Sequence, residues 1–263
     1  YYFKTFKDMK NFGFIPPVIA PTDYFLGSKK LGSIDINPTG KWTEYLPIFE
    51  PQSKTIDTNA CVSFAMTSCA EILYKFLYAN EVNMSDRFLA SVSGTKPEQG
   101  GNTPNKVADS FRKSGAVPET EYPFVDNLTE YYQPIPPRTT DIGLKWLLDN
   151  TFGYEWCDSS LLKNALRRSP VGCAVSAWQT NTQGEYIRFG ASNHFVTLIA
   201  FDEQDRPVIF DSYEPRIKTL EKDFKLEFPQ MYILKKKDPV TEYKKSGGWW
   251  LTQIINNFFR IWK

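Results

Sequence analysis

Histidine is almost absent from this chain, because its 263 residues include a single one, His194. Any imidazole chemistry must therefore use that side chain. Cysteine is scarce as well: there are four, and their spacing fits no common metal site. If one cysteine is a nucleophile, an odd number remains. We therefore expect a mainly reduced protein, with a bridge between Cys157 and Cys173 left open.

An excess of charge of either sign is also lacking. The chain carries 31 basic and 30 acidic side chains, which argues against a phosphate-tracking surface and against nucleic acid as a partner. Its start lacks the long apolar run of a secretory signal, and Pro16 and Pro17 interrupt the first apolar stretch. These features favour a reducing compartment such as the cytoplasm, or a virion. Without an initiator Met, the chain is expected to be an excerpt or a processed product.

Three segments differ in their sequence pattern. Residues 1–41 are punctuated by Pro and Gly and predict an extended arm laid over the surface of the domain. Residues 42–238 carry helical patterns first and strand patterns later, which predicts an α+β domain. Residues 239–263 contain a Ser-Gly-Gly joint and then an amphipathic aromatic helix at 249–263, too short to span a bilayer. That helix could fold back, dock on a protein partner or a second copy, or lie in a membrane interface, which is not favoured.

The clearest helical pattern begins after Asn59. Apolar side chains recur at spacings of three and four from Val62 to Phe76, which predicts a helix with one buried face. Either Thr58 or Asn59 is expected to cap its first turn. Cys61 then lies in that turn, where free backbone N–H groups favour a thiolate.

An imidazole and a carboxylate follow far downstream on strand patterns. Residues 193–201 predict a strand that includes His194, and Pro207–Phe210 predicts a second strand that is followed by Asp211. Together with Cys61 these are the parts of an activated cysteine nucleophile. Each part also has an ordinary interpretation, as a buried thiol, a core histidine or the start of a turn. The order and spacing of all three favour catalysis.

Six short motifs then follow one another along most of the chain, at 61–65, 84–89, 99–104, 115–124, 170–176 and 193–196. They read Cys-Val-Ser-Phe-Ala, Met-Ser-Asp-Arg-Phe-Leu, Gln-Gly-Gly-Asn-Thr-Pro, a Gly-Ala-Val-Pro to Tyr-Pro-Phe stretch, a strand beginning Pro-Val, and Asn-His-Phe-Val. In this order they resemble the papain-like cysteine peptidases. The segment before the first motif, at 42–52, resembles phage-encoded members.

The resemblance implies a two-lobed fold, with a helical N-terminal lobe, a central helix that bears the nucleophile, and an antiparallel β-rich C-terminal lobe. It implies a cysteine-type endopeptidase in which the Cys61 thiolate attacks a peptide carbonyl and forms an acyl-enzyme. Such an enzyme would need no metal or other cofactor. His194 would transfer protons, and Asp211 would replace the family's asparagine as the group that orients the ring. The arm at 1–41 would correspond to an inhibitory propeptide-like segment.

The oxyanion of such a reaction needs a side-chain amide besides the Cys61 backbone N–H. The family has a glutamine six residues before the cysteine, where this chain has Thr55. We expect Gln52 to supply the amide, which requires a three-residue insertion in the loop. Asn59 is the competing candidate.

Four further residues are expected to bind substrate. Gly100 and Gly101 would present bare backbone to an extended peptide, although a simple turn before the next helix explains them equally well. Asn193 and Tyr213 lie next to the expected histidine and aspartate, and Tyr213 replaces a tryptophan that shields the histidine in the family.

Two other functions use the same residues differently. One is an amidase or acyltransferase that acts on non-protein amides through the same three groups. The other is a catalytically silent papain-fold protein in an assembly such as a virion. The intact set of thiol, imidazole and carboxylate argues against lost catalysis, and a peptide or protein substrate is the expected partner.

Overall fold

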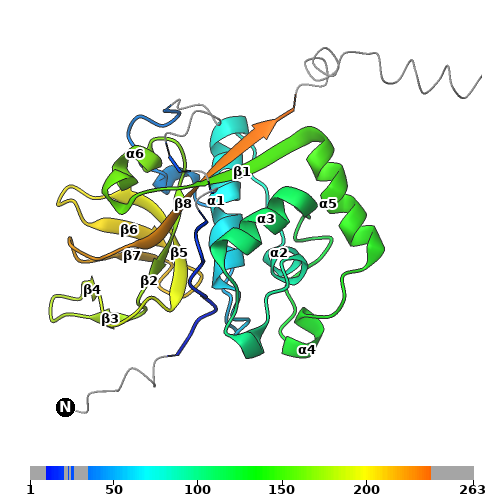
Figure 1. Ribbon diagram of the computed structural model, residues 1–263, viewed down its shortest axis with the longest axis horizontal. Helices are drawn as coiled ribbons and strands as arrows, with labels where there is room; N and C mark the ends of the chain where they lie inside the picture. The colour runs from blue at the N-terminus through cyan, green and yellow to red at the C-terminus, as the bar shows by residue number, and fades with distance from the viewer. Residues whose placement is uncertain (1–9, 21–22, 24, 27–34, 238–263) are drawn as a thin grey trace, which may run out of the picture.

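The computed structural model describes residues 10–20, 23, 25–26 and 35–237. They form a helical lobe and a sheet-based lobe, with the long helix α1 between the two (Figure 1). The helices are α1 (Cys61–Tyr78), α2 (Asp86–Val92), α3 (Pro104–Ser114), α4 (Leu128–Tyr131), α5 (Pro137–Asp149) and α6 (Leu162–Leu166), with short 3-10 turns η2 (Thr43–Tyr45), η3 (Pro97–Gln99) and η4 (Ser159–Leu161). The predicted α+β class and the two-lobed arrangement are confirmed.

In the described part of the chain, one six-stranded sheet has the order β1-β8-β2-β5-β6-β7, and all neighbours are antiparallel. Its strands are β1 (Asn150–Trp156), β2 (Val171–Val175), β5 (His194–Phe201), β6 (Pro207–Phe210), β7 (Ile217–Thr219) and β8 (Glu227–Lys236), and a separate hairpin joins β3 (Gln179–Thr180) to β4 (Tyr186–Ile187). Of these, β2, β5 and β6 follow the sequence prediction, and β6 has the predicted bounds.

Helix α1 begins at Cys61, as expected, but its cap differs from the prediction. Ala60 is the capping position, and no side chain accepts a hydrogen bond there. Asn59 has a left-handed backbone, with a φ of 50°. Gly13 packs so closely on it that a Cβ at Gly13 would lie 2.1 Å from the Asn59 carbonyl oxygen. The expected cap by Thr58 or Asn59 is therefore wrong, because this backbone packs against the arm instead of folding over the helix.

Helix α1 packs against β5 and thereby joins the two lobes. Seven of the eight residues of β5 are buried, since the strand is paired on both edges and covered by the helix. The Thr197 hydroxyl donates a hydrogen bond of 2.9 Å to the Ala65 carbonyl of α1. This contact joins the N-terminal part of α1 to the middle of β5, three residues after His194.

The arm does not lie over the surface as predicted. Its described part, residues 10–20, runs between the lobes and is drawn in blue in Figure 1. Phe14 is 1% exposed, and its ring stacks on that of Phe195 at a centroid distance of 5.9 Å. A parallel β-bridge joins Phe14 to Asn102. The arm is thus part of the core, because its aromatic side chain completes the packing between the lobes.

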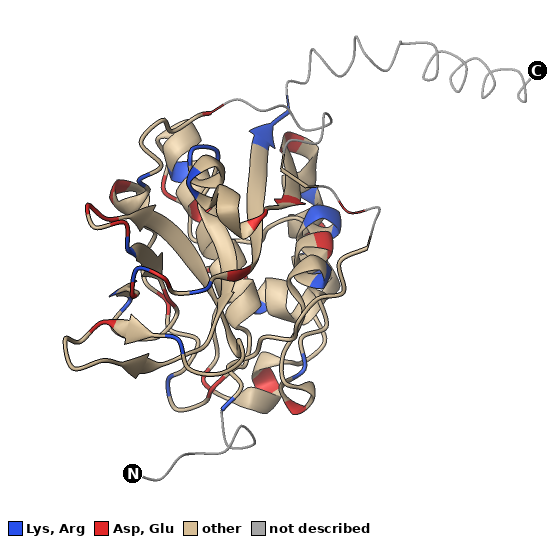
Figure 2. Cartoon of the chain, turned by 60° about the vertical axis from the view of Figure 1, so that its left-hand side comes forward, with Lys and Arg blue, Asp and Glu red and all other residues tan. Residues whose placement is uncertain are grey.

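Several expectations concern the rest of the chain. The tail helix at 249–263 and its joint lie outside the described residues, as do residues 1–9. None of the described helices is long and apolar enough to cross a membrane. Cys61, Cys69, Cys157 and Cys173 are all free and buried, so the bridge that was left open is not formed. Figure 2 shows acidic and basic residues interspersed over both lobes in the described part.

Candidate active site

Cys61 is the first residue of α1, and its side chain is fully buried. Burial raises the pKa of the Cys61 thiol well above its ordinary value, and the carboxylates of Asp211 and Asp57 raise it further. A hydrogen bond from the Phe195 backbone acts in the opposite direction but does not reverse the shift. In this closed arrangement the neutral thiol is favoured, in spite of the N-terminal position on the helix.

His194 and Asp211 come from neighbouring strands and form a direct pair. His194 opens β5, and Asp211 follows the last residue of β6. The distance between His194 Nε2 and Asp211 Oδ1 is 2.6 Å, and both side chains are inaccessible to solvent. His194 Nδ1 has no hydrogen-bond partner among the described residues. The aspartate therefore holds one ring nitrogen and leaves the other available for a proton transfer.

Three aromatic rings surround the imidazole. Phe12, Tyr213 and Trp178 lie with their ring centroids 5.3, 5.4 and 5.8 Å from that of His194. Tyr213, which was expected to bind substrate, thus lies against the imidazole, and Trp178, which follows β2, adds a ring that the sequence did not indicate. Phe12 belongs to the arm. The imidazole is consequently shut off from water on these sides.

Gln52 lies beside this pair and is held by several hydrogen bonds. Its Nε2 donates to the Phe12 carbonyl oxygen at 3.0 Å, to the Tyr213 hydroxyl at 2.9 Å and to Asp57 at 3.2 Å. Its Oε1 accepts from the Ser212 hydroxyl at 2.8 Å. The amide is therefore fixed in orientation, with N–H groups facing a backbone carbonyl that enters the cleft. No side-chain hydrogen bond of this kind is found for Asn59 among the described residues.

The arm is anchored at the same place by polar contacts. Phe12 N–H donates to the Asn193 carbonyl at 2.9 Å, and the Asn193 side-chain amide donates to the Lys10 carbonyl at 2.8 Å. The Lys10 ammonium lies 2.5 Å from Asp57. Burial acts to raise the pKa of Asp57, but hydrogen bonds from Lys10 and Tyr213 outweigh it and lower that pKa. Asn193, an expected substrate-binding residue, thus binds the arm through its backbone and its side chain.

The two glycines expected to bind substrate face the arm as well. A Cβ at Gly101 would lie 2.0 Å from the Gly13 carbonyl oxygen, and one at Gly100 would lie 3.0 Å from the Asn11 side chain. The backbone pairing itself is made by the next residue: Asn102 N–H donates to Gly13 at 3.1 Å and its carbonyl accepts from Ile15 at 2.9 Å. The glycines therefore allow a chain to approach, and Asn102 holds that chain.

Comparisons with known proteins bear on the fold. No model of a known protein family matches the sequence, and no curated protein matches it. Solved structures do match. The ragweed pollen cysteine protease Amb a 11 in its proform has a TM-score of 0.58 at 17% identity, over 81% of this chain and 69% of that one. Xylellain, a cysteine protease from Xylella fastidiosa, has a TM-score of 0.59 at 13% identity, over 88% and 98%. The chain has a papain-like fold.

A digestive procathepsin L2 proteinase from Tenebrio molitor agrees with this fold. It has a TM-score of 0.61 at 13% identity and covers 87% of this chain and 80% of its own. At such identities the likeness concerns the fold. Within the papain-like fold, the cysteine, the histidine–aspartate pair and the glutamine are brought together by α1, β5 and β6 and the loop before α1.

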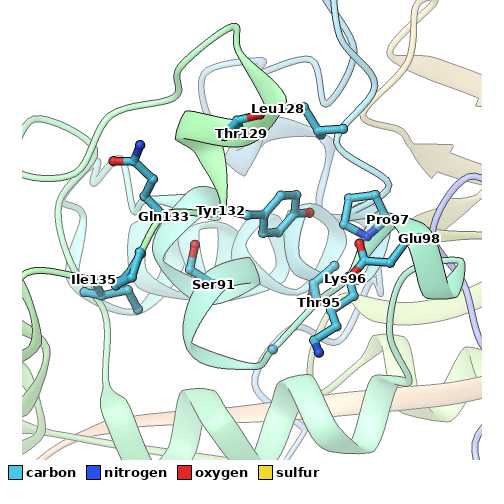
Figure 3. A pocket seen from close by; sticks show the side chains of 12 residues that line it. Ser91, Thr95, Lys96, Pro97, Glu98, Leu128, Thr129, Tyr132, Gln133 and Ile135 are labelled. Carbon is cyan, nitrogen blue, oxygen red and sulfur yellow. The ribbon is translucent and has the colours of Figure 1, made fainter.

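A hollow in the described part of the papain-like fold lies away from Cys61. It measures about 530 Å³ and is formed between the segment after α2 and the segment around α4. Figure 3 shows the Tyr132 ring in it, pointing toward Pro97 and Glu98. The Tyr132 hydroxyl donates a hydrogen bond of 2.6 Å to the Thr58 carbonyl, three residues before Cys61. The hollow thus borders the loop before α1 without including Cys61.

Sequence analysis missed two charged residues of the site. Asp57 looks like an ordinary loop carboxylate, and Lys218 lies in the three-residue strand β7, where a lysine normally faces solvent. Lys218 is nevertheless 2% exposed and donates a hydrogen bond of 2.7 Å to Asp211. No local pattern marks either residue, since their partners are distant in sequence or lie across a turn.

Proposed function

We propose that this protein is a cysteine-type endopeptidase that uses Cys61, His194 and Asp211. The observation that carries the proposal is the 2.6 Å contact between His194 Nε2 and Asp211, at the end of α1 where Cys61 begins the helix. This contact occupies one ring nitrogen and leaves Nδ1 to accept the proton of the Cys61 thiol. The papain-like fold, which this chain shares with cysteine proteases, supports hydrolysis of peptide bonds at the level of the fold.

In the proposed mechanism the Cys61 thiol transfers its proton to His194 Nδ1, and the thiolate sulfur attacks the carbonyl carbon of the peptide. The carbonyl oxygen takes the negative charge and is stabilised by the Gln52 amide and the Cys61 backbone N–H. The imidazolium then protonates the leaving amine, the C–N bond breaks, and a thioester remains. His194 next removes a proton from water, whose oxygen displaces Cys61 from the acyl group.

We further propose that the arm keeps this enzyme inactive. Phe12 shields His194, and its carbonyl oxygen accepts the amide hydrogen bond that the oxyanion requires. The raised pKa of the buried Cys61 thiol has the same consequence, because the thiol is then the wrong form for attack. A substrate must therefore displace the arm at residues 10–15, or the arm must be removed by cleavage.

Active-site labelling tests the proposal directly. The full chain, with and without limited proteolysis of the arm, is treated with an epoxide inhibitor of thiol proteases, and mass spectrometry locates the adduct. One adduct on Cys61, lost in His194→Ala, is expected after the arm is cut. Labelling of Cys69, Cys157 or Cys173 at the same rate as Cys61 would contradict a selectively activated thiol.

Product analysis then distinguishes the peptidase from the amidase or acyltransferase alternative. Peptides, amine acceptors and muropeptides are supplied to the arm-cleaved chain, and the expected products are shorter peptides. A folded, reduced and cleaved chain that forms no adduct and no product would favour the silent structural protein. The phage origin indicated by the segment at 42–52 stays an expectation from the sequence.

A further inference from the structure

Lys218 is a buried lysine whose ammonium group has three acceptors, one for each of its N–H bonds. They are Asp211 Oδ2 at 2.7 Å, the Tyr213 carbonyl at 2.7 Å and the Pro215 carbonyl at 2.6 Å. A neutral amine has two N–H groups, so this arrangement needs the charged form. Burial lowers the pKa of Lys218, while Asp211 opposes that shift. The set of acceptors is built for a cation.

The aspartate divides its two oxygens between two partners. Asp211 Oδ1 faces His194 Nε2, and Asp211 Oδ2 faces Lys218. Its backbone N–H donates at 2.7 Å to the Arg216 carbonyl, which closes the turn between β6 and β7. The carboxylate therefore cannot rotate without breaking contacts on both sides. Burial acts to raise the pKa of Asp211, but His194 and Lys218 lower it, so it is held as an anion.

The lysine is enclosed on its remaining side by aromatic rings. Its Nζ lies 5.2 Å from the centroid of Trp178 and 5.8 Å from that of Tyr186. Trp178 also contacts the His194 ring. Without the lysine, the Asp211 carboxylate would be an unpaired buried anion, which costs free energy. It would also raise the affinity of the His194 imidazole for its proton. A cation 2.7 Å from the carboxylate removes most of that excess charge.

We propose that Lys218 is a positioning residue: it orients Asp211 and balances its charge, so that the Asp211–Lys218 pair offers His194 a nearly neutral hydrogen-bond acceptor. An amide side chain at position 211 would offer His194 a neutral hydrogen-bond acceptor without needing a cation beside it. Asp211 and Lys218 therefore act as one unit. The inference rests on the proposed roles of His194 and Asp211, but its test does not require turnover.

The single histidine makes the test direct, because labelled histidine gives one imidazole signal from the full chain. Its NMR titration is recorded in the wild-type chain, in Lys218→Met, in Asp211→Asn and in the double variant. Lys218→Met should move the titration midpoint of the ring up by about one pH unit, a tenfold gain in proton affinity. Asp211→Asn should move it down, and the double variant should return it close to wild type.

The other titratable residues near His194, Asp211 and Lys218 are the same in all four proteins. They are Cys61 on α1, Asp57 and Lys10 at the arm, Tyr213 and Glu214 after β6, and Tyr186 on β4. Lys222→Met, which removes an exposed lysine just after β7, is the matched control and should leave the midpoint unchanged. If Lys222→Met shifted the midpoint as far as Lys218→Met does, the inference would be overturned. A midpoint in Lys218→Met equal to that of the wild-type chain would overturn it as well.

The cycle stays informative if Lys218→Met does not fold. The double variant buries neither charge, so it is compared with Asp211→Asn alone. Loss of the cation in that background should raise the midpoint back toward wild type. Identical midpoints in these two proteins would overturn the inference. Failure of the peptidase proposal would show instead as absence of Cys61 labelling with the titration shifts intact.

Discussion

The Gln52 side-chain amide donates a hydrogen bond of 3.0 Å to the backbone carbonyl oxygen of Phe12. A donor proposed to stabilise a reacting carbonyl is thus occupied by a carbonyl of the same chain. The same amide is fixed by Tyr213 and by Ser212, so it does not need to reorganise when the arm leaves. We therefore propose Gln52, and not Asn59, as the oxyanion donor.

We expect Gln52→Ala to lower kcat by about 10²–10³-fold with little change in KM, because the lost donor acts on charge that develops in the transition state. Steady-state peptide hydrolysis by the arm-cleaved chain measures this. Asn59→Ala is the comparison and should cost much less. A larger loss of kcat in Asn59→Ala than in Gln52→Ala would show that Asn59, and not Gln52, makes the oxyanion contact.

Gly13→Ala should release the arm. Gly13 has a φ of 110°, and a Cβ there would collide with the Asn59 backbone. The expected result is faster alkylation of Cys61 in the full chain, with a lower pH midpoint, because water then reaches the thiol. Gly184→Ala is a matched control: its φ is 81°, but no atom lies within 4 Å of the added Cβ. Equal alkylation rates in Gly13→Ala and wild type would refute the blocking role of the arm.

The three proposed catalytic residues should differ in their effects. Cys61→Ala should abolish turnover while the fold is kept, since alanine fits the N-terminal turn of α1. His194→Ala should lose nearly as much, and Asp211→Ala less, because the ring keeps some of its orientation from the surrounding aromatic side chains. Peptide hydrolysis with a melting curve for each variant measures both quantities. Residual wild-type rates in Cys61→Ala would end the thiol mechanism.

The positions of Cys61, His194 and Asp211 could be predicted because each lies where a periodic pattern begins or ends. Such boundaries are local, and the strand β6 even has its predicted bounds. Helix α2 also has a local boundary signal: Ser85 accepts a hydrogen bond from the Phe88 N–H and caps the first turn.

The arm and helix α5 could not be predicted from local signals. The arm has no periodicity, and its burial depends on a cleft formed by residues far away. Helix α5 starts at Pro137 and contains Gly143, which resembles a loop in sequence. The proline occupies the first turn, where it needs no N–H partner, and a Cβ at Gly143 would lie 2.3 Å from the Ser114 carbonyl oxygen. Close helix packing, invisible in one sequence, explains that glycine.

Three acids, Glu71 on α1, Asp86 on α2 and the half-buried Glu119 after α3, predict how stability depends on pH. Burial raises the pKa of Glu119 to about 7, and it also raises the pKa values of Glu71 and Asp86. From about pH 4.3, the ordinary glutamate value, up to pH 7 the folded chain binds more protons than the unfolded chain, so the free energy of unfolding falls as pH rises. Asp57 and Asp211 have lowered pKa values and act oppositely, with stability lost only below about pH 4.

The melting temperature should therefore be higher at pH 5 than at pH 8. Glu119→Gln removes one of these titrations and should flatten the decline, with a gain at pH 8 and little change at pH 5. Calorimetry at a series of pH values measures the slope. Asp109→Asn, which alters an exposed carboxylate paired with Arg112, is the control. A slope in Glu119→Gln as steep as in wild type would contradict the assignment.

The last strand of the described chain, β8, lies in the interior of the sheet, between β1 and β2. A nascent chain that has emerged only as far as β7 contains α1, the imidazole and the carboxylate, but β2 still has an open edge and β1 has no neighbour. The two halves of the sheet can join only after residue 236 has emerged, so folding of this domain must wait for its last strand. A nascent chain would thus complete the sheet that holds His194 and Asp211 only when β8 joins it, and the arm has already been synthesised by then.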